Sequence, residues 1–363
     1  MKKMVPDYIE NLPLYPPGKP IEEVRREYGI AEDIIKLASN ENCLGPSPLA
    51  LKAAQESLAS IHLYPDNGCF YLKQKIANKF GITVSQIITG HGSNEIIQLI
   101  ATAFLCPGEE VITSEQTFLL YPIMSNSRGA QVVQVPLKNF AYDLHSIARK
   151  ITEHTKIVFI SNPNNPTGTM VEADVFNAFM AQIPPDVIVV VDEAYAEYVT
   201  SPDYPDALKY LRQNRNIIIL RTFSKAYGLA GLRIGYGLST EQLIGYLERV
   251  RVPFNVSHVA QAAACAALDD GAHIKRSQDN NRSGCAYICA ALTGMGVPFV
   301  PTQTNFILIR LGERAEEIYR ALLCEGVIIR SMASYGLKDF VRVTIGLPEE
   351  NERFIQSLKK FIK

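Results

Sequence analysis

The sequence predicts an α/β protein with two parts: a large domain with a mostly parallel central sheet, and a smaller α+β domain. A length of 363 residues suits two domains or one large α/β unit. Apolar residues make up 47% of the chain and charged residues 20%, a composition that supports a substantial core and excludes a disordered chain. Between about residues 49 and 247, short apolar runs alternate with helical patterns, as expected for parallel strands joined by helices.

The expected strands of the central sheet are apolar runs at residues 86–89, 111–113, 132–135, 157–160, 187–191, 217–220 and 234–237. After about residue 250 the pattern changes to an Ala-rich helix at 258–268, a helix at 281–292 and strand-like runs at 305–311 and 340–345. These later elements fit a smaller α+β domain. We therefore expect an N-terminal arm and part of the small domain at 1–45, the large domain at 46–250 and the small C-terminal domain at 251–363.

The beginning of the chain is rich in proline, which favours an extended arm, and a short helix is expected at 21–28. With 36 basic and 37 acidic side chains, the net charge of -1 gives no global attraction to nucleic acid or to an anionic membrane. The seven cysteines form no CxxC pair and no cluster with zinc spacing, so no metal site is expected. Because no secretory signal and no run of ~18 apolar residues is found, we expect a cytoplasmic protein.

A glycine-containing turn follows the first expected strand. Gly92, Ser93 and Asn94 stand immediately before a helical pattern. The free N–H groups and the positive end of the helix dipole at such a place can bind a phosphate. The alternative is an ordinary helix cap, in which Ser93 or Asn94 bonds the first N–H groups.

Polar residues also follow two later strands. Residues 161–168 form a loop with two prolines and three asparagines, among them Asn165, which keeps side-chain amides outside regular structure. Asp192 follows directly after the apolar run at 187–191, where a carboxylate needs a cation or several hydrogen-bond donors. The alternatives for these two motifs are a rigid turn and a helix cap.

The strand at 217–220 is followed by hydroxyls and cations. Thr222 and Ser224 can complete an anion site together with Arg233, and Lys225 is a candidate amine nucleophile. A solvated basic turn is the alternative. Because the carboxyl ends of parallel strands meet at one edge of a sheet, we expect these motifs to form one site.

Pyridoxal phosphate is the cofactor whose requirements this set of residues meets. Its aldehyde needs a lysine, its phosphate needs hydroxyls and a helix N-terminus, and its ring nitrogen needs a carboxylate. The motifs NPNNPTG, DEAY and RTFSKAYGLAGLRIGY, in this order and spacing, resemble those of the fold type I aminotransferases over nearly the whole chain.

This resemblance implies a role for each matching residue. Lys225 would form the Schiff base with the cofactor, and Asp192 would pair with its ring nitrogen. Asn165 and Tyr195 would donate to the ring hydroxyl oxygen, and Phe118 would stack on the ring. Asn165 would also contact the substrate. The residues that would hold the phosphate are Gly92, Ser93, Asn94, Thr222, Ser224 and Arg233.

The motifs LYPPGKP, LASNEN, LGPSP and YPD in the N-terminal half resemble more narrowly the histidinol-phosphate aminotransferase family. Tyr15 matches a tyrosine that lines the substrate pocket of that family. Tyr64 matches one that reaches the cofactor phosphate of the other subunit, which implies a homodimer with shared active sites. Arg342 matches an arginine that binds the carboxylate or phosphate of the substrate, and Arg330 a second arginine of that pocket. Arg342 is also expected on the face of its strand opposite to its apolar neighbours.

The resemblance implies transamination of L-histidinol phosphate with 2-oxoglutarate, giving imidazole acetol phosphate and L-glutamate in histidine biosynthesis. Lys225 would move the proton, with Asp192 and Tyr195 acting on the cofactor. An aromatic amino acid aminotransferase and a threonine-phosphate decarboxylase of the same subgroup share these cofactor residues and stay open. A nicotinamide-dependent dehydrogenase is not indicated, because residues 90–95 lack the third glycine of GxGxxG.

Overall fold

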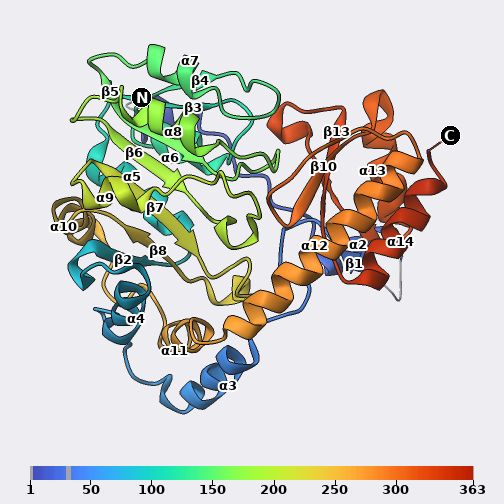
Figure 1. Cartoon of the computed structure of the whole chain (residues 1–363), viewed down its shortest axis with the longest axis horizontal. Coiled ribbons are helices and arrows are strands. Elements are labelled where there is room, and N and C mark those ends of the chain that lie inside the picture. The colour runs from blue at the N-terminus through green and yellow to red at the C-terminus, as the bar shows by residue number, and fades with distance from the viewer. Residues whose placement is uncertain (1–2, 30–33, 363) are drawn as a thin grey trace.

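The large domain is built around a seven-stranded sheet with the order β2-β8-β7-β6-β5-β3-β4 (Figure 1). The computed structural model describes residues 3–29 and 34–362. The strands are β2 (Ile87–Gly90), β3 (Glu110–Ser114), β4 (Gln131–Val135), β5 (Thr155–Ser161), β6 (Ile188–Asp192), β7 (Ile217–Thr222) and β8 (Gly235–Leu238). β8 runs antiparallel to both of its neighbours, and the other pairs are parallel. The predicted mostly parallel sheet is confirmed, with strand ends within two residues of those expected.

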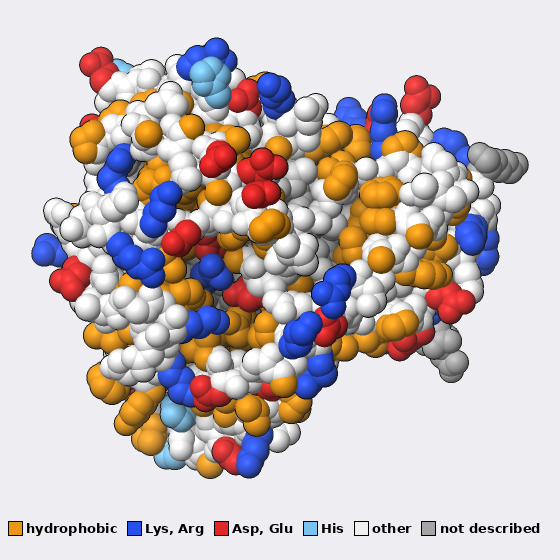
Figure 2. Space-filling model, viewed as in Figure 1, with side chains coloured by type: hydrophobic (Ala, Val, Ile, Leu, Met, Phe, Trp, Pro, Cys, Tyr) orange, Lys and Arg blue, Asp and Glu red, His pale blue; other side chains and the backbone are white. Residues whose placement is uncertain are grey.

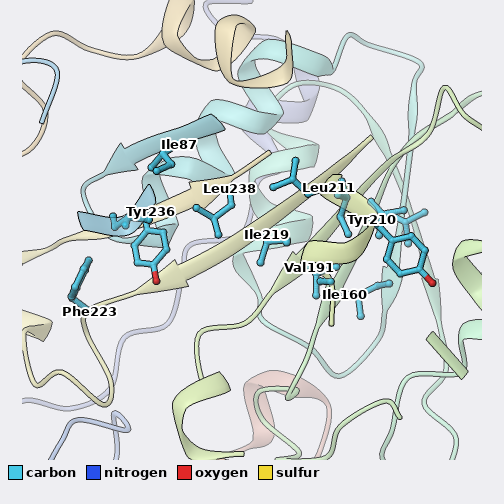
Figure 3. Close-up of a cluster of buried hydrophobic side chains, with 14 of the residues drawn as sticks. Ile87, Ile160, Val191, Tyr210, Leu211, Ile219, Phe223, Tyr236 and Leu238 are labelled. Carbon is cyan, nitrogen blue, oxygen red and sulfur yellow. The ribbon is translucent and has the colours of Figure 1, made fainter. Parts of the chain in front are cut away.

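Helices cover both faces of this sheet, because successive residues of a buried strand point to opposite sides. In β6, Val189 and Val191 pack into one hydrophobic core, whereas Ile188 and Val190 pack into the other. The first core, part of which is shown in Figure 3, is completed by α3 (Pro48–Ser57), α4 (Phe70–Phe80), α7 (Leu144–Arg149), α8 (Ala173–Met180), α9 (Leu208–Arg212) and α11 (His258–Ala267). The second core is completed by α5 (Ser93–Phe104), α6 (Leu120–Asn126) and α10 (Glu241–Val250).

The small domain has a four-stranded antiparallel sheet in the order β12-β13-β10-β9. Its strands are β9 (Phe299–Val300), β10 (Phe306–Arg310), β12 (Arg330–Ser331) and β13 (Phe340–Thr344), and its helices are α12 (Gly271–Gly294), α13 (Ala315–Cys324) and α14 (Pro348–Lys359). β1 (Ile35–Lys36) pairs in parallel with β11 (Val327–Ile328). The next residue, Leu37, packs into the hydrophobic core of the small domain. The N-terminal segment and the C-terminal region therefore fold together.

The helix predicted at 258–268 forms as α11, but it does not belong to the small domain. Ala260, Ala263, Ala264 and Ala267 are fully buried in the first core of the large domain, where α11 packs on α3 and α4. Alanine side chains are short enough to let these helices approach closely, so the predicted boundary at residue 251 is wrong for this helix. The amino-acid composition changes near residue 251, but the chain continues to pack in the large domain through α11.

The helix predicted at 281–292 is the second half of a longer one. α12 begins at Gly271, where the Asp270 side chain caps it by accepting from the His273 N–H at 3.0 Å. In Figure 1, α12 runs from the foot of the large domain into the small domain and so connects the two. The predicted helix in the N-terminal segment is confirmed as α2 (Ile21–Tyr28), and the arm also contains an unpredicted turn, α1 (Asp7–Glu10).

Basic and acidic side chains are intermixed over the face shown in Figure 2, in keeping with the net charge of -1. Among the described residues, no helix is both long and apolar enough to cross a membrane. Within the same residues, no three His, Cys, Asp or Glu side chains gather as a possible metal site.

Candidate active site

A cavity of about 410 Å³ lies between the two domains, beyond the carboxyl ends of β5, β6 and β7. This is the edge of an open α/β sheet at which ligands bind. All the predicted site residues except Gly92 and Tyr64 line it, namely Tyr15, Ser93, Asn94, Phe118, Asn165, Asp192, Tyr195, Thr222, Ser224, Lys225, Arg233, Arg330 and Arg342. The structure therefore brings motifs that are far apart in the sequence into one place.

One end of the cavity has the features of an anion site. Gly92 precedes α5 with φ 74°, and Ser93 and Asn94 begin the helix at the cavity wall. The Arg233 guanidinium lies against this turn, where a Cβ on Gly92 would stand 2.7 Å from Arg233 Nη2. Arg233 donates to the Ala230 carbonyl at 3.0 Å, and it forms no ion pair with a carboxylate among residues 3–29 and 34–362. A cation beside a helix N-terminus favours a phosphate.

The two predicted hydroxyls stand at the same end. Thr222 Oγ1 donates to Ser224 Oγ at 2.9 Å, and both residues are buried at the end of β7. β8 can lie beside this end only because residue 235 is glycine, since a Cβ there would come within 2.6 Å of the Ser93 nitrogen. This glycine was not singled out from the sequence, because its role depends on the approach of β8 to α5.

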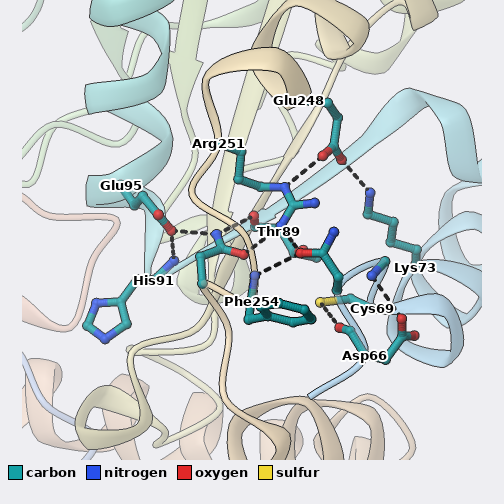
Figure 4. A network of polar contacts seen from close by, with 12 residues as sticks. Asp66, Cys69, Lys73, Thr89, His91, Glu95, Glu248, Arg251 and Phe254 are labelled. Carbon is teal, nitrogen blue, oxygen red and sulfur yellow. Dashed lines mark hydrogen bonds and ion pairs between the residues drawn. The ribbon is translucent and has the colours of Figure 1, made fainter. Parts of the chain in front are cut away.

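A polar network outside the cavity holds the start of α5 (Figure 4). The Glu95 carboxylate accepts from the His91 N–H at 2.5 Å and from Asn255 Nδ2 at 2.7 Å. The Glu248 carboxylate forms ion pairs with Arg251 at 2.6 Å and with Lys73 at 2.8 Å. The His91 imidazole points away from this network, so the residue takes part through its backbone.

Tyr64 does not reach the cavity of its own chain. Its side chain is 84% exposed and stacks on Phe254, with ring centroids 4.8 Å apart. The expected contact between Tyr64 and the cofactor of another subunit therefore stays a prediction.

Asp192, for which the sequence predicts a positively charged partner, is buried in the wall of the cavity. It ends β6, is 5% exposed, and accepts from Tyr121 Oη at 2.8 Å and from the Ala194 N–H at 3.1 Å. Burial raises the pKa of Asp192 to about 6, against the opposing effects of these donors and of Lys225. Sequence reasoning missed Tyr121, which also packs edge to face with Phe118 at 5.6 Å.

Lys225 places a side-chain amine in the cavity. Its Nζ donates to the Ser39 carbonyl at 3.0 Å and lies 5.7 Å from the centre of the Tyr195 ring. Burial, together with the positive charge of Arg342, lowers the pKa of Lys225 to about 7. A substantial fraction of this amine is therefore unprotonated near neutral pH, as a nucleophile requires.

Two arginines form the end of the cavity in the small domain. Arg330 in β12 stands directly opposite Arg342 in β13, so their side chains share one face of the sheet. Arg342 donates to Asn165 Oδ1 and to the Ala38 carbonyl, the latter at 2.8 Å, while its buried Nε has no partner in the described part of the chain. Like charges placed opposite each other are destabilising unless an anion lies between them. The Val341 and Val343 side chains enter the core on the other face, which confirms the predicted direction of Arg342.

The segment after β1 lines the cavity and was missed as part of the site. Its successive carbonyls bind site groups: that of Ala38 accepts from Arg342 and that of Ser39 from Lys225. Asn40 and Glu41 also line the cavity. In the sequence these residues belong to the motif LASNEN, which carried the family resemblance, but no role in the site was predicted for them because a residue pattern does not show where backbone carbonyls point.

A family model described as aminotransferase class I and II matches residues 32–358. The histidinol-phosphate aminotransferase of Moorella thermoacetica is 47% identical over 349 residues, which are 96% of this chain and 90% of that protein. That of an Anaeromyxobacter strain is 45% identical over 361 residues, 99% of both chains. The solved histidinol-phosphate aminotransferase of Sinorhizobium meliloti in complex with pyridoxal-5'-phosphate superposes with a TM-score of 0.91 at 28% identity, covering 100% of this chain and 98% of its own.

Proposed function

The chain belongs to the class I and II aminotransferases and is a pyridoxal-phosphate-dependent enzyme of fold type I, and we propose that it transfers the amino group of L-histidinol phosphate to 2-oxoglutarate. The products would be imidazole acetol phosphate and L-glutamate, in a step of histidine biosynthesis. Relatives named histidinol-phosphate aminotransferase, 44–47% identical over nearly the whole chain, support this substrate.

The paired arginines of the small domain are the observation that carries the substrate proposal. Arg330 and Arg342 stand opposite each other on one face, and the Nε of Arg342 is buried without a partner in the described residues. Two guanidinium groups suit a phosphate dianion, and they also suit the α-carboxylate of 2-oxoglutarate, the carboxylate next to its keto carbon. One pocket can therefore serve both the donor and the acceptor.

The residues around the cavity fit the cofactor. Lys225 supplies an amine with a lowered pKa, Asp192 a buried carboxyl group, and Arg233 a cation beside the start of α5. Asn165 accepts from Arg342 through Oδ1, which leaves its Nδ2 available as a donor. When bound, pyridoxal phosphate supplies an electron sink for the charge that develops at the donor's Cα.

The chain's own groups then have separate tasks. Lys225 Nζ, as a free base, would take the proton from the donor's Cα and deliver it to the C4′ carbon of the cofactor, and it would move a proton in the opposite direction when the acceptor reacts. The Asp192 carboxylate would keep a positive charge on the ring nitrogen of the bound cofactor. Because Asp192 and Tyr195 are buried in the cavity wall, water would compete little for these contacts.

The test of the substrate is a direct comparison of amino donors. Purified enzyme with 2-oxoglutarate should give a kcat/KM for L-histidinol phosphate well above those for phenylalanine and tyrosine. A preference for the aromatic amino acids would overturn the proposal. Release of carbon dioxide from threonine phosphate at a comparable rate would instead favour the decarboxylase.

Removal of Arg330 should weaken the reaction of a donor that carries a phosphate more than that of a donor without one. We expect Arg330→Met to lower kcat/KM for L-histidinol phosphate by about 10- to 100-fold, the effect of one charge-assisted hydrogen bond, and to lower that for tyrosine less. Arg320→Met is the matched control, because Arg320 is an exposed arginine of α13 that pairs with Glu316. Equal losses for both donors in Arg330→Met would show that Arg330 does not select the phosphate.

We also propose that the enzyme is a cytoplasmic homodimer in which each subunit completes the other's site. The connection from α3 to α4 and the start of α4 expose large apolar side chains, including Ile61 (65% exposed), Tyr64 (84%) and Tyr71 (77%). Hydrophobic side chains are visible along the lower left edge of Figure 2, over this connection. An apolar surface of this kind is typical of a subunit interface. The cytoplasm is supported by the free thiols of all seven cysteines.

Complementation in mixed dimers tests the shared site. Tyr64→Phe alone should weaken cofactor binding about tenfold, the effect of one hydrogen bond to a charged group. When Tyr64→Phe and Lys225→Ala subunits are combined, a shared architecture leaves one site with both residues intact. The mixed dimer should therefore retain one cofactor per two subunits with the affinity of the unchanged enzyme. If only weakly bound cofactor is found, the contact across the interface does not exist.

A further inference from the structure

Asn40 lies at the junction of the two domains, in the cavity wall and next to Ser39, whose carbonyl binds Lys225. It is 1% exposed and has φ 57°, a left-handed conformation that asparagine tolerates better than most residues. No role was assigned to it from the sequence. Its burial in a strained backbone conformation beside the reactive lysine indicates that its side chain is needed there.

Every polar group of Asn40 has a partner. Its N–H donates to Thr344 Oγ1 at 3.0 Å, and its carbonyl accepts from Asn305 Nδ2 at 3.1 Å. Its Oδ1 accepts from Thr344 Oγ1 at 3.2 Å, and its Nδ2 donates to Tyr195 Oη at 2.9 Å. Thr344 and Asn305 belong to the small domain, whereas Tyr195 follows β6 of the large domain. Asn40 therefore connects the small domain to a single group of the large domain, the Tyr195 hydroxyl.

The orientation of the Asn40 amide follows from these bonds. The Thr344 hydroxyl accepts from the Asn40 N–H and donates its one proton to Asn40 Oδ1. The amide Nδ2 then faces Tyr195 as a donor. Because Tyr195 Oη accepts from Asn40, its own proton points elsewhere.

The proton of Tyr195 remains available to a ligand in the cavity. Its hydroxyl makes no second hydrogen bond within residues 3–29 and 34–362. Burial raises the pKa of Tyr195 above its ordinary value, against the effects of Arg342 and of the Asn40 hydrogen bond, so the phenol stays protonated at neutral pH. The charged and titratable groups that face it are Arg342, Asp192, Lys225 and Tyr335.

We propose that Asn40 is a positioning residue for aminotransfer, which directs the Tyr195 hydroxyl proton toward the ring hydroxyl oxygen of bound pyridoxal phosphate. This inference rests on the proposed role of Tyr195 as a donor to that oxygen. A donor held in this direction favours the deprotonated form of the ring hydroxyl. Loss of Asn40 leaves the Tyr195 hydroxyl free to rotate and weakens that preference.

The experiment is a pH titration of the visible absorption of the holoenzyme. Asn40→Gly is the chosen variant, because glycine adopts a positive φ without strain, whereas alanine does not. We expect it to raise the pH midpoint of the absorption change by roughly half to one unit, the effect of one hydrogen bond. Asn139→Gly is the matched control, an exposed asparagine with φ 51° outside the cavity, and its midpoint should not move.

A double variant separates action through Tyr195 from a merely structural role. Tyr195→Phe should raise the midpoint at least as far as Asn40→Gly, and the double variant should match Tyr195→Phe alone. An unchanged midpoint in Asn40→Gly, or a full additional shift in the double variant, would refute the positioning role. If Tyr195→Phe itself leaves the midpoint unchanged, Tyr195 is not a donor to the ring hydroxyl oxygen, and the role of Asn40 that depends on it is also refuted. A thermal unfolding curve of each variant verifies that the fold is intact.

Discussion

Replacement of Lys225 with alanine is expected to remove the covalent attachment of the cofactor and to lower kcat by about 10²–10⁴-fold, the range for loss of a positioned proton-transfer group. Lys225 supplies the amine with a lowered pKa in the cavity. Borohydride reduction followed by mass spectrometry should find the cofactor linked to Lys225 in the unchanged enzyme and absent from the variant. Lys275→Ala, which removes an exposed lysine of α12, should keep the link. Full turnover by Lys225→Ala would make the assignment wrong.

The pH dependence of cofactor capture follows from the same pKa. Below about pH 7 the Lys225 amine is mostly protonated and unreactive, and above it the free base predominates. The rate at which cofactor-free enzyme captures pyridoxal phosphate should therefore rise with pH and level off above neutrality. A midpoint near ~10.4, the value of a solvated lysine, would contradict the effect of burial and of Arg342.

Asp192→Asn is expected to have the second largest effect, a loss of about 10²–10³-fold in kcat. The asparagine amide matches the carboxylate in shape and can still accept from Tyr121, but it carries no negative charge to balance a protonated ring nitrogen. Single-turnover measurements with the amino donor separate this effect from binding. Tyr121→Phe, which removes one donor from Asp192 and keeps the charge, should cost much less. Comparable losses in the two variants would show that the charge is not the reason.

The strands of the large sheet could be predicted because each is a short apolar run with a clear end. The placement of α11 could not, because an Ala-rich helix has no amphipathic pattern that reveals its neighbour. Its four buried alanines fit α3, a contact between segments about 200 positions apart in the sequence.

The lining of the cavity was predictable where it consists of side chains with distinctive chemistry, as for Lys225, Asp192 and Arg233. It was not predictable where backbone atoms or indirect contacts contribute. The carbonyls of Ala38 and Ser39 bind Arg342 and Lys225 without any residue preference. The roles of these carbonyls become visible only when the two domains are placed together.

The hydrogen bonds between Asn40 and Thr344 join residues 304 positions apart in the sequence. Because of this separation, the site cannot be complete until Thr344 has been synthesised. Asn40 is synthesised before Asp192 and Lys225, and Arg342 and Thr344 follow all three. A nascent chain can thus form most of the large sheet while Asn40 and the Ala38 carbonyl still lack their partners. Long-range closures of this kind form slowly. Assembly of the site therefore waits for β13, which closes on a segment translated 304 positions earlier.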